Sequence, residues 1–220
     1  MAEFPAAPVA PAEFLTDWLP RAFADTPVPD DVKGAEIALG IRLDGDGGGE
    51  WVLRIDQGTV SVQPEPRGET AFTYVQSVDD WQGALWQGRG GAIGQGAAGL
   101  FRPGSTPPGD ASGMGAPSLT ALEQLRALDG VIRLVVTGGE GGDWAVAFKL
   151  GPGDIPEEPT TTVSVSHEDA AKMQSGELNP MEAFMAGRIQ VAGDMALMMQ
   201  MQAIQMQAAA TAAAAAKSSG

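Results

Sequence analysis

Residues 178–206 read LNPMEAFMAGRIQVAGDMALMMQMQAIQM, and this stretch predicts a helix, a short strand and a second helix in that order. The first helix should begin at Pro180, because Asn179 is a favourable N-cap and proline suits the first helical position. After it, Ile189 and Val191 alternate with small or polar residues, as is typical of a strand with one buried face. We therefore expect two helices around one strand at this end of the chain.

Methionine dominates the second helix, which Asp194 is placed to cap. The apolar residues cover more than one face of this helix and are Met195, Leu197, Met198, Met199, Met201, Ile204 and Met206. A helix that is apolar nearly all round must be enclosed, and flexible, polarizable methionine side chains adapt to surfaces of more than one shape. The helix is interpreted either as the wall of a cavity or partner groove, or as an ordinary core helix filled with methionine.

The run SGELNPMEAFMAGRIQVAGD, residues 175–194, resembles the signature of the sterol carrier protein type-two family. The matching positions come in the family's order and are Gly176, Leu178, Pro180, Ala183, Phe184, Gly187, Arg188, Ile189, Gly193 and Asp194. The resemblance extends back to about Gly130. It implies an α+β fold, in which a curved, mostly antiparallel sheet backed by helices surrounds an apolar tunnel that holds a lipid or acyl chain.

The first half of the chain repeats the pattern of the second half. The matched segments are 40–43 with 131–134, 49–51 with 142–144, and the helix-capping pair Ser77 and Asp80 with Ser166 and Asp169. We therefore predict two related units in tandem, although the first unit lacks a counterpart of residues 179–194. The predicted divisions are a degenerate sterol-carrier-like unit at 1–103, a Pro/Gly/Ser linker at 104–117, a lipid-binding unit at 118–208 and an Ala-rich tail at 209–220.

Composition limits the classes of partner. The 220 residues carry a formal net charge of −15, which argues against binding nucleic acid or an anionic bilayer through a broad basic surface. Any membrane contact should be transient. The N-terminal residues do not resemble a secretory signal, no stretch reaches transmembrane length, and the chain contains no cysteine. We therefore expect a cytoplasmic protein.

The sequence predicts no catalytic residue, no metal site and no cofactor. The single histidine, His167, lies beside the cap Ser166 and is interpreted as a solvated residue at a helix end. The glycines Gly94, Gly96 and Gly99 satisfy a G-x-G-x-x-G spacing, but no apolar strand leads into them, so the match is treated as a coincidence. These observations favour a protein that is not an enzyme.

The predicted function is the binding or transfer of a fatty acyl chain, acyl-CoA, sterol or similar lipid. The alternative is a protein–protein interaction or oligomerisation module that uses the Met-rich helix, which includes a possible homodimer. One ligand site per chain is expected, in the second unit. Its predicted wall, based on the family resemblance and on apolar spacing, comprises Met181, Phe184, Met185, Ile189, Val191, Met195, Met198, Met199 and Met201.

Overall fold

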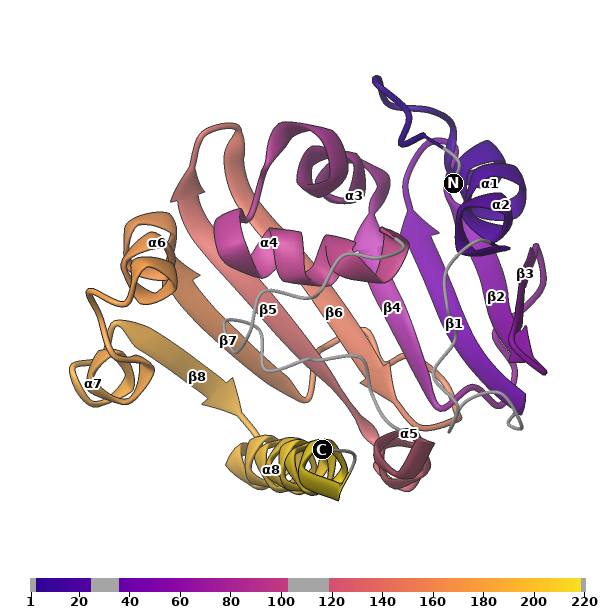
Figure 1. Cartoon of the computed structure of the whole chain (residues 1–220). Helices are drawn as coiled ribbons and strands as arrows, with labels where there is room; N and C mark the ends of the chain where they lie inside the picture. The colour runs from indigo at the N-terminus through magenta and orange to yellow at the C-terminus, as the bar shows by residue number, and fades with distance from the viewer. Residues whose placement is uncertain (1–2, 25–35, 103–118, 219–220) are drawn as a thin grey trace.

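Eight strands form one mixed sheet in the computed structural model, which describes residues 3–24, 36–102 and 119–218 (Figure 1). Five neighbouring pairs are antiparallel and two are parallel, so the predicted α+β class, with a mostly antiparallel sheet backed by helices, is confirmed. The strand order is β3-β2-β1-β4-β6-β5-β7-β8. The strands are β1 (Glu36–Asp44), β2 (Gly49–Asp56), β3 (Thr59–Gln63), β4 (Phe72–Ser77), β5 (Gly130–Gly139), β6 (Gly142–Leu150), β7 (Thr161–Ser166) and β8 (Ile189–Gly193).

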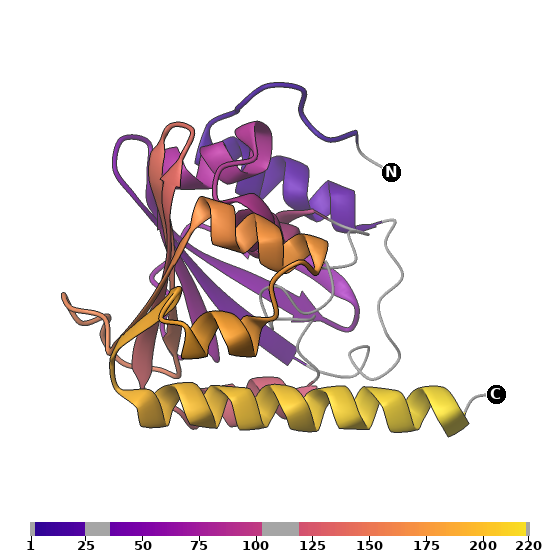
Figure 2. The same ribbon diagram turned by 90° about the vertical axis from the view of Figure 1, so that its left-hand side faces the viewer.

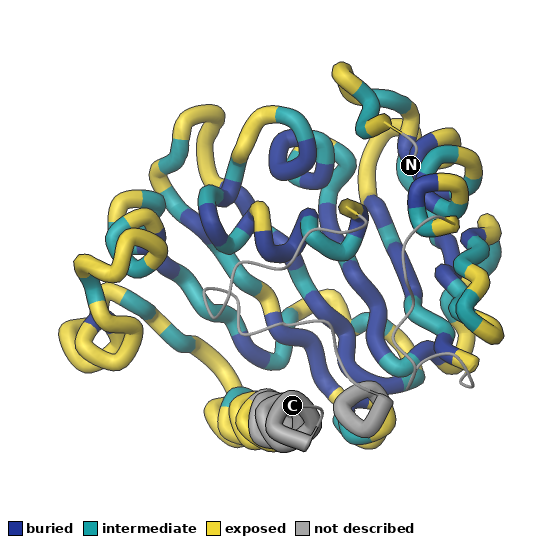
Figure 3. Tube along the Cα trace, viewed as in Figure 1, coloured by how far each residue is buried: buried dark blue, intermediate teal, exposed yellow. Residues whose placement is uncertain are grey.

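The helices gather on one side of the sheet, and α5 and α8 run past the ends of the strands (Figures 1 and 2). The α-helices are α1 (Pro11–Glu13), α2 (Leu19–Ala24), α3 (Val78–Gln82), α4 (Gly91–Ala98), α5 (Leu119–Arg126), α6 (His167–Ser175), α7 (Pro180–Met185) and α8 (Met195–Ser218), and the segments Phe14–Trp18, Gly83–Gln87 and Gly99–Phe101 are π- or 3-10-helical. Within the described ranges, none of them is long and apolar enough to cross a membrane. The core therefore lies between one face of the sheet and this helical layer, as the buried segments in Figure 3 show.

The structure describes most of the predicted Ala-rich tail but not the predicted linker. The predicted linker, residues 104–117, lies outside the described residues. The Ala-rich tail predicted from residue 209 continues α8 as far as Ser218.

Strand pairing follows the same pattern in both halves of the chain. In the first half, β1 pairs antiparallel with β2 and parallel with β4. In the second half, β5 pairs antiparallel with β6 and parallel with β7. The sequence repeat thus has a counterpart in the topology, while the division of the chain into two units stays a prediction.

The two halves are joined edge to edge by β4 and β6. These strands pair antiparallel, from Phe72 opposite Leu150 to Val75 opposite Ala147. Strands β2 and β6 occupy equivalent positions in the two halves. The neighbour of β2 on the side away from β1 is β3, and the neighbour of β6 on the side away from β5 is β4. On the helix side, the ring of Phe148 lies 5.7 Å from the ring of Tyr74, between centroids. We call this pairing the central joint.

Polar contacts link the halves beside the central joint. The indole Nε1 of Trp144 donates to the backbone oxygen of Asp80 at 2.9 Å. Arg89 forms ion pairs with Asp79 at 2.5 Å and Asp80 at 3.0 Å, and it also donates to the backbone oxygen of Asp143 at 3.0 Å. Side chains of α3 and of the turn before α4 are therefore tied directly to β6.

The tryptophans of the first half fill its own core. Trp81 is fully buried, and its ring lies 5.2 Å from that of Phe14 and 5.8 Å from that of Trp86, between centroids. Trp86 also donates its indole hydrogen to the backbone oxygen of Pro5 at 2.7 Å. Trp144 contributes to the contact between halves, because it reaches from β6 to α3.

A chain cut to residues 118–208 is expected to unfold cooperatively but with lower stability than the whole chain. The cut retains β5 to β8 and removes β4, so β6 loses a neighbouring strand and Phe148 loses its contacts with Phe72 and Tyr74. Urea denaturation followed by circular dichroism measures the transition. A transition without cooperativity would contradict independent folding of this unit, and an unchanged midpoint would contradict a stabilising role for the central joint.

Candidate functional site

Helix α7 presents its apolar residues to solvent. The side chain of Asn179 accepts a hydrogen bond from the backbone nitrogen of Met181 at 2.8 Å, which confirms the predicted cap. The buried Ala183 anchors the helix to the protein. By contrast, Met181 is 61% exposed and Met185 is 80% exposed. The predicted wall residues of α7 therefore lie on an open surface of the chain.

The turn between β8 and α8 is built around Gly193. Its φ of 98° is a left-handed conformation, and a Cβ placed there would lie 2.2 Å from the backbone oxygen of Thr160, so only glycine fits. The next residue, Asp194, accepts a hydrogen bond from the backbone nitrogen of Ala196 at 2.7 Å and caps α8 as predicted. This turn sets the direction in which α8 leaves the sheet.

Helix α8 has one buried face and one exposed face along its first three turns. Leu197 and Met201 are buried and lie one turn apart, while Met198 is half-buried. Met195 and Met199, also one turn apart, are exposed. The helix is thus attached to the core along one side, although its sequence is apolar nearly all round.

All the large apolar side chains that are exposed in the described part of the chain fall between residues 181 and 206. We call five of them, which flank β8, the apolar end. They are Met181, Phe184, Met185, Met195 and Met199. The remaining predicted wall residues are the half-buried Ile189, Val191 and Met198 and the buried Met201. Exposed apolar side chains that are concentrated in one stretch of the chain indicate a candidate site for a ligand or partner.

An ion pair holds the start of β8 against α6. Arg188 donates to a carboxylate oxygen of Asp169 at 2.6 Å, and the hydroxyl of Ser166 donates to the other carboxylate oxygen at 2.9 Å. The hydrogen bond from Arg188, aided by that from Ser166, holds the pKa of Asp169 below its ordinary value. Asp169, in the first turn of α6, therefore links the cap Ser166 to Arg188 at the start of β8.

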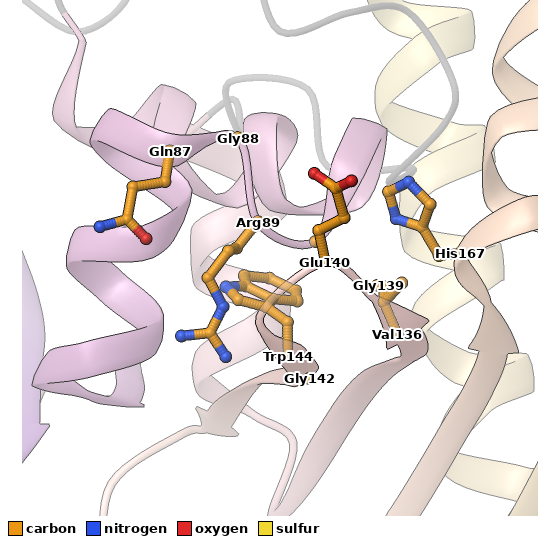
Figure 4. Close-up of a pocket in the computed structure, with 10 residues that line it drawn as sticks. Gln87, Gly88, Arg89, Val136, Gly139, Glu140, Gly142, Trp144 and His167 are labelled. Atoms are coloured by element: carbon orange, nitrogen blue, oxygen red, sulfur yellow. The ribbon is translucent and has the colours of Figure 1, made fainter.

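A separate pocket of about 230 Å³ lies between the turn before α4, the β5–β6 turn and the start of α6 (Figure 4). Arg89, Trp144 and His167 line it. A Cβ added to Gly139 would lie 3.4 Å from Nδ1 of His167. The imidazole is half-buried beside this glycine, so the expectation of a solvated histidine was wrong.

The pocket belongs to the junction between the two halves. The terminal nitrogens of Arg89 are engaged by Asp79 and Asp80, so its charge is already balanced by protein carboxylates. Gly94 packs against the backbone oxygen of Arg89, where a Cβ would lie at 2.1 Å, so this glycine serves helix packing. No group of His, Asp or Glu side chains in the described ranges is arranged to hold a metal ion.

Comparisons with known proteins relate the second half of the chain to one family. Residues 114–206 match the model of the SCP-2 sterol transfer family. Hydroxysteroid dehydrogenase-like protein 2 of Xenopus tropicalis is 33% identical over 92 residues, which cover 40% of this chain and 22% of that protein. Sterol carrier protein 2 of Rattus norvegicus is 30% identical over 92 residues, which cover 39% of this chain and 17% of that protein. The chain therefore spans less than a quarter of the length of either relative.

Among solved structures, the sterol carrier protein domain 2 of Helicoverpa armigera is 31% identical. The match covers 41% of this chain and 74% of that chain, with a TM-score of 0.29. The palmitated SCP2L2 of Aedes aegypti is 22% identical, and the match covers 39% of this chain and 91% of that chain, with a TM-score of 0.28.

Replacing Phe184 with alanine is expected to lower the free energy of unfolding by less than about 1 kcal/mol, because the ring is on the surface. Replacing the buried Phe148 is the matched comparison, and it should cost about 3–5 kcal/mol. Urea denaturation of both variants measures the difference. Equal losses would mean that Phe184 contributes to the core.

The ion pair of Asp169 should stabilise the fold at neutral pH and lose its effect in acid. Because its folded pKa lies below the ordinary value of 3.8, the contribution is complete above that value and is lost as the pH falls through the lowered pKa. Asp169→Asn should therefore lower the denaturation midpoint at pH 7, with a difference from the unmodified chain that shrinks below pH 3.8. A difference that persists undiminished in strong acid would contradict this origin.

Proposed function

We propose that this chain binds an apolar ligand and transfers it without chemical change, because residues 114–206 match the model of the SCP-2 sterol transfer family. This match supports lipid binding or transfer as the general function. The proposed ligand is a fatty acyl chain, an acyl-CoA, a sterol or a similar lipid. The matched relatives extend well beyond this chain, so any activity of their remaining parts is not carried over.

The observation that carries the proposal is the concentration of exposed apolar side chains in α7 and α8. Both helices lie within the part of the chain that matches the family, except for the end of α8. Such side chains gain free energy when a ligand or partner removes them from water. The proposed contact residues are those of the predicted wall, from Met181 to Met201, and an enclosed tunnel around the ligand is part of the proposal.

Burial of an alkyl chain supplies enough free energy for useful binding. Each methylene moved from water to an apolar environment contributes roughly 0.8 kcal/mol, so ten methylenes contribute about 8 kcal/mol. Ordering of the ligand and the side chains offsets part of this gain, which leaves micromolar affinity within reach. Methionine side chains suit this task, because they repack around ligands of different shape.

One ligand site per chain is proposed, in the second half. In the first half, α4 consists of glycine, alanine, one isoleucine and one glutamine. Its Gly94 packs closely against Arg89 and Trp144, and the small residues of the helix offer little apolar side-chain surface to a lipid. The Met-rich α8 has no equivalent among the described residues of the first half.

The alternative function is a protein–protein interaction or oligomerisation module that uses the same exposed surface. Native mass spectrometry of the purified protein, followed by organic extraction, separates the two functions. Lipid that co-purifies favours ligand binding, whereas a stable empty dimer favours the interaction module. We further propose a cytoplasmic location with at most transient membrane contact, since the net charge of −15 opposes lasting attachment to an anionic bilayer.

Replacing Met199 with glutamine is expected to weaken fatty-acid binding by about tenfold, equivalent to ~1.4 kcal/mol, because a polar amide replaces an apolar contact. Met206→Gln is the matched control. Met206 lies on the same helix and is 66% exposed, compared with 68% for Met199, but it is outside the proposed wall. Titration with a fluorescent fatty acid measures both affinities and the stoichiometry.

Three results would contradict the proposal. The first is a lack of saturable binding by the unmodified chain. The second is an equal loss of affinity in the Met199 and Met206 variants, which would place the ligand elsewhere on α8. The third is two equivalent sites per chain, which would contradict the assignment to the second half.

A further inference from the structure

The two edges of the sheet are protected differently. Strand β3 forms one edge, and α2 lies beside it in Figure 1. Strand β8 forms the other edge and pairs with β7 on its inner side, and α7 contacts it. Along its outer side, no strand from the described ranges pairs with it. An open edge presents unpaired backbone N–H and C=O groups, which form a template for another strand.

The sequence of β8 lacks the residue types that usually prevent edge strands of two molecules from pairing. The strand reads Ile-Gln-Val-Ala-Gly and contains neither proline nor a charged residue. From residue 189 to residue 207 the only charged side chain is Asp194, which caps α8. The whole chain carries a net charge of −15, and residues 189–207 contribute only one of its negative charges.

The apolar end provides much, but not all, of the surface that a standard interface needs. Its members range from 44% exposed for Phe184 to 80% exposed for Met185. Taking about 200 Å² for each fully exposed residue of this size, they leave roughly 600 Å² per chain, compared with ~800 Å² per partner in a standard interface. The strand edge and its neighbours supply the remaining area.

The chain already contains one edge-to-edge union of the same kind. At the central joint β4 and β6 pair antiparallel and combine two similar halves into one sheet. An antiparallel strand can also pair with its own copy about a two-fold axis, because each contact is then repeated in reverse. The open edge of β8 is therefore compatible in direction with antiparallel pairing to β8 of a second copy.

We propose that two copies of this chain pair antiparallel along β8, so that the sheet continues from one chain into the other. The pairing places the apolar ends of both copies at the interface. The inference rests on the proposed function in one respect, because the second copy would lie against some of the same apolar side chains that we propose contact the ligand. The backbone pairing itself requires no ligand.

Sedimentation equilibrium of the full chain, with and without dodecanoate, tests the pairing. The unmodified chain is expected to have twice the mass of one chain. Gln190→Glu keeps the size of the side chain and places a carboxylate from each copy at the joint, where like charges are destabilising. This variant should raise the dimer Kd by at least about tenfold, equivalent to ~1.4 kcal/mol.

Gln63→Glu is the matched control. Gln63 is also exposed but lies on β3, so the substitution changes the net charge by the same amount at the opposite edge. This variant should remain a dimer, and circular dichroism should show that both variants are folded. Equal dimer Kd values for the Gln190 variant and the unmodified chain would overturn the proposal.

The measurements with dodecanoate distinguish the proposed dimer from the proposed lipid-binding function. An unmodified chain that stays monomeric but binds dodecanoate would overturn the inference and support the proposed function. A dimer that dissociates on Gln190→Glu but binds no dodecanoate would support pairing through β8 and overturn the proposed function.

Discussion

The central joint is the contact on which the arrangement of the molecule depends. Two halves with the same strand-pairing pattern become one sheet because β4 occupies the edge of β6 that would otherwise be open. The aromatic contact between Tyr74 and Phe148 and the hydrogen bond from Trp144 to Asp80 strengthen this pairing on the helix side. With this edge filled, the sheet has two remaining ends, β3 and β8.

The contrast between these two ends explains where binding is expected. Helix α2 lies beside β3, so the first half is closed by its own helical segment. At β8 the neighbouring helices α7 and α8 use only part of their apolar surface to contact the core, through Ala183, Leu197 and Met201. The rest of that surface remains available for a lipid, a second copy of the chain, or both.

The pocket beside the junction and the apolar end differ in chemistry. In the pocket, Arg89 is engaged by carboxylates, and the nearby glycines pack closely against Trp144 and His167. The second half matches a family described by sterol transfer, and the apolar end supplies surface whose desolvation releases free energy. Both proposals therefore use the same driving force.

Local features were predictable from the amino-acid order. The caps at Ser166, Asn179 and Asp194 and the alternation in β8 follow from interactions within a few residues, so they appear as expected. The spacing of the methionines indicated that apolar side chains cover more than one face of α8. It could not reveal that Met199 faces solvent while Met201 is buried, because the exposure of each face depends on which distant segments cover it. The pairing of β4 with β6 and the partial burial of His167 beside Gly139 likewise arise from residues far apart in the chain, whose meeting no local pattern encodes.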